Sequence, residues 1–202
     1  MGCNFCTTSA FYGGKGKFVN FYETGDELYE VMSQAERSLG VQTFFIMDEN
    51  FLLHRERALQ LLGRMREGKK AWGMAVFASA NAIRKYSMEE LAELGVSWIW
   101  MGLESPRSNY AKLQDTDSHR LTHELRQHGI RVQGSTIIGL EHHTPDNIMD
   151  EIEYAVAHQT DFHQFMLYTP VPGTPLHAEM SAQGRMLTGI DYADIHGQDK
   201  FN

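Results

Sequence analysis

Thiols and long apolar runs are scarce in this sequence of 202 residues. Its two cysteines, Cys3 and Cys6, are separated by two residues, and this spacing excludes the disulfide framework of small secreted proteins. The apolar runs reach about five residues, far short of the roughly 20 that a membrane-spanning helix needs. No charged-then-apolar leader opens the chain, which argues against secretion. We therefore expect a protein of the reducing cytoplasm without a membrane span.

Positive charge is also in short supply. The chain holds 18 lysine and arginine residues against 26 aspartate and glutamate residues, a formal net charge of −8. A protein that binds a phosphate backbone normally presents a basic surface, so we expect no nucleic-acid partner. The length suits one domain of ordinary size, and the hydrophobic content of 42% is typical of globular proteins.

A repeated pattern runs through most of the chain: a helix, a glycine, an apolar strand and then polar residues. The helix-ending glycines are at positions 40, 68, 95 and 129. Two of the helices begin with capping boxes, at Thr24 and at Ser87. Such alternation indicates a parallel sheet covered by helices, and we favour a barrel over an open doubly wound sheet. The predicted strands lie near residues 42–47, 72–78, 97–103, 131–138 and 163–168.

Two further segments receive assignments from their composition. Residues 7–23 are polar and glycine-rich and are interpreted as a loop. A later helix is expected to have Thr144 as its N-cap and Pro145 at its first position. The residues expected on the inner face of that helix are Ile148, Ile152, Ala155 and Val156.

The Cys-x-x-Cys pair is the first candidate for chemistry. Two thiolates alone close neither a tetrahedral zinc site nor a four-iron cluster, so Cys3 and Cys6 would be half of a larger site. A thioredoxin-like redox pair is an alternative, but that motif should follow a strand and open a helix. Two ordinary buried thiols are the remaining interpretation.

Polar side chains follow two of the predicted strands directly. Asp48, Glu49 and Asn50 come after the first strand, and Glu104 and Ser105 come after the third. In barrel enzymes the carboxyl ends of the strands carry the chemistry. A carboxylate there can bind an ammonium group or ribose hydroxyls. Aspartate and asparagine are equally common in plain strand-end turns, so both interpretations stay open.

A divalent-metal site is an alternative at the same edge. It would use the carboxylates of Asp48, Glu49 and Glu104, with His142 and His143 as additional ligands. Adjacent side chains usually point in different directions, which favours an ordinary role for the two histidines. The corresponding function would be a metal-dependent hydrolase on a barrel scaffold.

Five stretches, in order along the chain, resemble the radical S-adenosylmethionine superfamily. The hallmark of that family is Cys-x-x-x-Cys-x-x-Cys with an aromatic residue before the third cysteine, and Cys3, Phe5 and Cys6 resemble its second half. The last stretch is especially similar to the subclass that has a cobalamin-binding domain ahead of the radical domain. The four strand-end stretches that carry the resemblance are Asp48–Phe51, Gly102–Pro106, Ile137–Leu140 and Tyr168–Leu176.

The chain departs from the family pattern in three places. The first cysteine, which would stand four residues before Cys3, and the first barrel strand are absent, so we expect a chain truncated at its N-terminus. The usual Gly-Gly-Glu after the second strand is Met47-Asp48-Glu49 here. The run from Glu141 to Thr144 replaces the Pro-Gly-Glu-Thr that is frequent in similar members.

The resemblance implies a fold, a domain organisation and a set of site residues. The fold would be α/β, a partial (β/α)6 TIM-like barrel of parallel strands that lacks the first strand. Residues 1–183 would form the core domain, and residues 184–202 an unassigned C-terminal tail. Cys3 and Cys6 would bind a 4Fe–4S cluster. The residues that would bind S-adenosylmethionine are Asp48, Glu49, Asn50, Glu104, Ser105, Gly139 and Tyr168.

The activity that the resemblance implies is reductive cleavage of S-adenosylmethionine. An electron from the cluster would open the sulfonium bond and give methionine and a 5′-deoxyadenosyl radical that acts on a small-molecule substrate. The reductant would be a protein such as a ferredoxin or flavodoxin. Cobalamin-linked methyl transfer through a domain absent here would follow in the complete protein. The competing expectation is a truncated, catalytically inactive fragment of such an enzyme.

Overall fold

The computed structural model describes residues 3–13, 21–103, 117–189 and 191. These residues belong to two compact units. The larger unit comprises residues 22–136 and 149–164, and the smaller comprises residues 1–21, 137–148 and 165–202.

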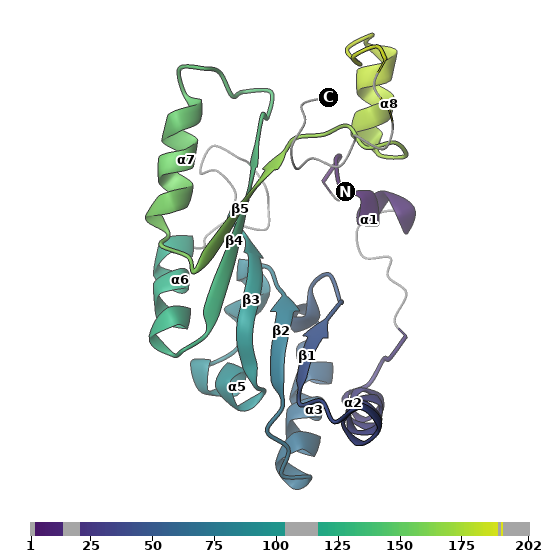
Figure 1. The fold of residues 1–202 in the computed structure, drawn as a ribbon, viewed down its shortest axis with the longest axis vertical. Helices are drawn as coiled ribbons and strands as arrows, with labels where there is room; N and C mark the ends of the chain where they lie inside the picture. The colour runs from purple at the N-terminus through teal and green to yellow at the C-terminus, as the bar shows by residue number, and fades with distance from the viewer. Residues whose placement is uncertain (1–2, 14–20, 104–116, 190, 192–202) are drawn as a thin grey trace. The chain divides into compact units, whose positions relative to one another are not determined.

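Helices and strands alternate along the described chain (Figure 1). In chain order the elements are α1 (Thr7–Phe11), α2 (Gly25–Leu39), β1 (Thr43–Ile46), η1 (Phe51–Leu53), α3 (Arg55–Glu67), β2 (Gly73–Phe77), α4 (Ala80–Ile83), α5 (Met88–Glu93), β3 (Val96–Gly102), α6 (Ser118–Gln127), β4 (Arg131–Ile138), α7 (Ile148–Ala157), β5 (Phe162–Leu167) and α8 (Pro175–Ala182).

The strands form one open, parallel sheet in the order β1-β2-β3-β4-β5. Figure 1 shows β1, β2 and β3 side by side and pointing the same way. The register pairs Phe45 with Ala75, Ala75 with Trp98 and Trp98 with Arg131. The predicted α/β fold with parallel strands is confirmed, and each observed strand overlaps its predicted range.

The core of the larger unit lies between one face of the sheet and helices α2, α3, α5 and α6. Alternate strand residues such as Met74, Val76 and Ile99 are fully buried there, as period-two strand geometry requires. The opposite face carries a row of rings across β1, β2 and β3. Phe45 lies 5.2 Å from Phe77, and Phe77 lies 5.0 Å from Trp100, between ring centroids.

Both predicted capping boxes are present. The Thr24 side chain accepts a hydrogen bond from the backbone N–H of Glu27, and the Glu27 carboxylate accepts one from the N–H of Thr24. Ser87 and Glu90 make the same reciprocal pair at the start of α5. Each pair satisfies N–H groups that a helix leaves without internal partners.

The structure differs from the sequence expectation in two local features. Part of the predicted loop over residues 7–23 is the short helix α1, whose N-cap is Cys6. Helix α7 begins at Ile148 rather than at Pro145, because the Asn147 side chain accepts a hydrogen bond from the N–H of Thr144 and closes a turn there. Among the described helices, none combines the length and the apolar character that a membrane crossing requires.

The predicted inner face of α7 is correct except at one position: Ala155 is buried and Ile148 and Ile152 are partly buried, but Val156 points outward. Val156 is 59% exposed, whereas Ala155 and His158 are buried. His158 lies just after the helix and bonds to α6, with its Nε2 2.8 Å from the Ser118 hydroxyl. Its ring is stacked on His119, with centroids 3.7 Å apart. The apolar pattern did not indicate the buried His158, because its contact with Ser118 is polar.

Burial lowers the pKa of His158 to about 4 from an ordinary value of 6.5, and the neighbouring His119 adds to the effect. Between these two pH values the unfolded chain binds a proton at His158 that the folded chain does not bind. The free energy of unfolding therefore falls as the pH is lowered from 6.5 to 4, by roughly 3 kcal/mol in total.

We expect the His158→Gln variant to lose this part of the pH dependence. The measurement is urea denaturation at several pH values between 4 and 7. His123→Gln, which removes an exposed histidine from α6, is the matched control and should keep the wild-type slope. A wild-type slope in His158→Gln would contradict the assignment.

Candidate functional site

The Cys3–Cys6 loop is a compact turn in the smaller unit. The backbone N–H of Cys6 donates to the carbonyl of Cys3 over 3.2 Å. Neither cysteine forms a disulfide, and both are partly buried. The Cys6 sulfur accepts a hydrogen bond from the N–H of Ser9 at 3.4 Å, where it caps helix α1. Hydrogen bonds to sulfur are typical of the protein environment of iron–sulfur clusters.

The two residues between the cysteines contact the segment that follows β5. The Tyr168 ring packs edge-on against Phe5, with centroids 5.7 Å apart. The Asn4 side chain donates to the Tyr168 phenol oxygen at 3.3 Å. Burial raises the pKa of Tyr168 above its usual value. Tyr168 therefore lies directly beside the Cys3–Cys6 loop.

A turn after β4 contains the predicted Gly139. This residue has a φ of 81°, a value that L side chains rarely adopt and that glycine adopts without strain. The N–H groups of Gly139 and Leu140 both point at Nδ1 of His143, at 3.1 and 3.3 Å. The histidine thus closes the turn at the position where the family pattern has a glutamate.

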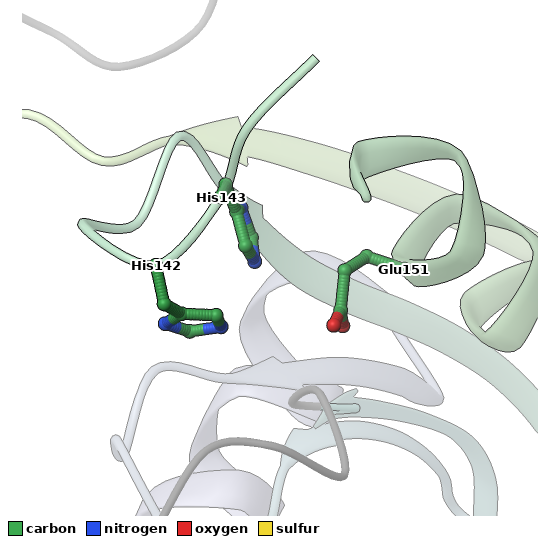
Figure 2. Close-up of side chains that lie close together, drawn as sticks. All are labelled: His142, His143 and Glu151. Carbon is green, nitrogen blue, oxygen red and sulfur yellow. The ribbon is translucent and has the colours of Figure 1, made fainter. Parts of the chain in front are cut away.

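The geometry of this turn bears on the divalent-metal alternative. Figure 2 shows the imidazoles of His142 and His143 on the turn, and their ring centroids are 4.5 Å apart. Because Nδ1 of His143 accepts two N–H groups, its proton resides on Nε2. A histidine nitrogen must be unprotonated to bind a metal. This hydrogen bonding argues against His143 as a ligand through Nε2. Figure 2 also draws Glu151, which belongs to α7.

In the larger unit, Asp48 follows β1 and forms an ion pair with Arg57 of α3. The Arg57 side chain is only 8% exposed and also donates to the carbonyl of Tyr22 at 3.2 Å. The second carboxylate oxygen of Asp48 accepts the N–H of Asn50 at 3.3 Å. The Asp48 carboxylate is therefore fixed in place by its own neighbours. Glu49, the next residue, is exposed.

Asn50 connects the ends of two neighbouring strands. Its amide nitrogen donates to the hydroxyl of Ser79 at 3.0 Å, and its amide oxygen accepts the N–H of Ser79 at 3.1 Å. Ser79 follows β2, so this reciprocal pair fixes the end of β1 against the end of β2. The side chain predicted to bind a cofactor thus has a structural role at the carboxyl edge of the sheet.

The remaining predicted site residues stay as predictions. Glu104 and Ser105 lie outside the described residues. The expected meeting of Asp48, Glu49, Glu104 and Tyr168 at one mouth also stays a prediction, because Tyr168 belongs to the smaller unit and Asp48 and Glu49 to the larger.

Three contributors to the site were not identified from the sequence as site residues. Ser79 could have been predicted as a site residue, because it is a polar residue directly after an apolar strand. Arg57 had none, since nothing in the pattern of α3 marks it as the partner of Asp48. Asn4 lay inside the noticed cysteine motif, but its contact with Tyr168 joins residues 164 positions apart and is invisible to local patterns.

The donor set of the Cys3–Cys6 loop fits an iron–sulfur cluster in part. Two thiols on a tight turn, one of them with an N–H donor to sulfur, suit two of the cluster's thiolate positions. The sequence of 202 residues contains no third cysteine.

Comparison with known proteins shows to which family the chain is related. Residues 1–156 match the family model of the radical SAM superfamily. The bacteriochlorophyllide d C-12(1)-methyltransferase of Chlorobaculum tepidum is 29% identical over 205 residues, which cover 97% of this chain and 44% of the relative. The hopanoid C-2 methylase of Rhodopseudomonas palustris is 24% identical over 213 residues, 97% of this chain and 40% of the relative. The chain thus spans less than half of each relative.

A solved structure is similar in fold. It is the radical S-adenosylmethionine methyltransferase TsrM from Kitasatospora setae, with cobalamin and a 4Fe–4S cluster bound. The TM-score is 0.62 at 17% identity, and the match covers 78% of this chain and 33% of TsrM. Family model, relatives and fold agree with the motifs read from the sequence. The chain belongs to the radical S-adenosylmethionine superfamily.

Proposed function

We propose that this chain is the S-adenosylmethionine-cleaving domain of a radical enzyme, and that the complete protein transfers a methyl group to a small molecule. The observation that carries the proposal is the family match over residues 1–156 together with the compact Cys3–Cys6 loop. Methyltransferases among the relatives, and the cobalamin bound to TsrM, support methyl transfer linked to cobalamin on another domain. A ferredoxin or flavodoxin in the cytoplasm would serve as the reductant.

When bound, a 4Fe–4S cluster supplies the electron that cleaves S-adenosylmethionine into methionine and a 5′-deoxyadenosyl radical. The residues of the chain would hold the reactants. Cys3 and Cys6 would provide two thiolates for the cluster, and Glu104 would accept a charge-assisted hydrogen bond from the ammonium group of the methionine moiety. The Asn50–Ser79 pair would hold the end of β1 against the end of β2.

Binding of S-adenosylmethionine tests this assignment. The experiment uses a chain that is extended at its N-terminus so that a cysteine stands four residues before Cys3. This extended chain is loaded with its cluster under anaerobic conditions. We expect Glu104→Gln to weaken binding roughly 10- to 100-fold, because a charge-assisted hydrogen bond contributes about 1.5–3 kcal/mol. Isothermal titration calorimetry gives the dissociation constants.

The control is Glu153→Gln, which neutralises an exposed carboxylate on α7 and should leave the affinity unchanged. Equal affinities of wild type and Glu104→Gln would remove Glu104 from the site. A loaded, folded protein with no measurable affinity for S-adenosylmethionine would contradict the proposed function as a whole.

A further inference from the structure

The run from Tyr168 to Leu176 touches the cysteine loop at both of its ends. At the first end, Tyr168 contacts the Phe5 ring and shares hydrogen bonds of 3.3 and 3.5 Å with the Asn4 side chain. At the second end, the backbone N–H of Leu176 donates to the backbone carbonyl of Asn4 at 3.0 Å. Asn4 is therefore bonded through both its side chain and its backbone.

This run is itself held in one shape. The Thr169 hydroxyl donates to the carbonyl of Leu167 at 3.1 Å, and the Thr174 hydroxyl donates to the carbonyl of Val171 at 2.6 Å. Thr174 also caps α8 by accepting the N–H of His177 at 3.2 Å. Three of the chain's five prolines lie in the run, and each fixes its φ angle. The Cys3–Cys6 loop therefore contacts a segment that has little conformational freedom.

We propose that the run Tyr168–Leu176 is a cradle for the Cys3–Cys6 loop, and that Asn4 and Tyr168 are positioning residues that aim the two thiols. A loop attached at one point can pivot, whereas side-chain, ring and backbone contacts on both sides of Asn4 fix its orientation. The role of this cradle toward a cluster rests on the proposed function. Its effect on the thiols does not, and it can be measured on the chain without a cluster.

The first experiment measures how fast iodoacetamide alkylates Cys3 and Cys6 in the 202-residue chain, followed by peptide mass spectrometry. Tyr168→Phe keeps the ring contact with Phe5 and removes the phenol hydrogen bonds. Asn4→Ala removes the other partner. We expect each variant to raise both alkylation rates about 2- to 10-fold, the value of one net hydrogen bond.

A double-mutant cycle and a control complete this test. Because Asn4 and Tyr168 act through one contact, the double variant should alkylate no faster than the faster single variant. Tyr12→Phe removes a phenol hydroxyl from the same N-terminal segment, leaves the Asn4 contacts in place and should not change the rates. Unchanged rates in Tyr168→Phe and Asn4→Ala, or effects that multiply in the double variant, would overturn the proposal.

The midpoint potential of the bound cluster distinguishes positioning of the thiols from a general change in stability. In the N-terminally extended chain loaded with its cluster, the midpoint potential is expected to differ between Tyr168→Phe and wild type but not between Tyr12→Phe and wild type. Equal melting temperatures of the three proteins would exclude general loosening as the cause. A potential that is the same in all three would mean that the cradle does not position the thiols toward the cluster.

Discussion

After anaerobic reconstitution with iron and sulfide, the 202-residue chain is expected to bind much less iron than a complete cluster contains, which is about four irons per chain. Its two cysteines supply two thiolates, so one of the three irons that the protein holds in this family has no thiolate from this chain. The measurement is iron and acid-labile sulfide per chain after gel filtration. Near-stoichiometric content of four irons, lost in Cys3→Ala, would contradict the expectation.

The N-terminally extended chain is the matched comparison. With a cysteine four residues before Cys3, it should retain a near-complete cluster. Cys6→Ala in that background should return the iron content to the level of the shorter chain or below. An extended chain that binds no more iron than the shorter chain would show that a third thiolate is not what limits cluster binding.

Gly95→Ala is expected to have the largest effect on stability among single substitutions at the helix-ending glycines. Gly95 has a φ of 81°, and an added Cβ would overlap the backbone carbonyl oxygen of Trp72. The left-handed backbone and the overlap together cost roughly 3–5 kcal/mol, since strain and overpacking both apply. The measurement is the free energy of unfolding in urea.

Gly129→Ala is the control for the backbone term alone. Gly129 has nearly the same φ, 77°, but no described atom lies within 4 Å of an added Cβ. Its cost should be about 1–2 kcal/mol, the penalty of a left-handed L-residue. Equal losses in the two variants would show that the close approach of Gly95 to Trp72 does not matter.

These glycines also show how far the sequence determines the fold. The periodic apolar pattern with a glycine after each helix correctly predicted the parallel sheet and its strands. The pattern did not indicate why each of these positions requires glycine. Gly40, Gly95 and Gly129 have positive φ, whereas Gly68 has a φ of −79° and instead leaves room for the Tyr29 hydroxyl.

The site could be predicted less fully because its geometry depends on contacts between distant residues. The strand-end motif indicated Asp48 and Asn50, since polar residues directly after an apolar strand are a local signal. Their partners, Arg57 and Ser79, lie 9 and 29 positions further along the chain. No periodicity connects such pairs, so no local pattern predicted that Asp48 would be paired with an arginine.

The proposed function predicts that this domain cleaves S-adenosylmethionine once a third cysteine completes the cluster site. The most direct measurement is the yield of 5′-deoxyadenosine and methionine, by liquid chromatography and mass spectrometry, from the extended chain with its full cluster and dithionite under strict anaerobiosis. We predict both products in equal amounts from the wild type and none from Cys6→Ala. A protein with a demonstrated complete cluster that forms neither product would contradict the claim.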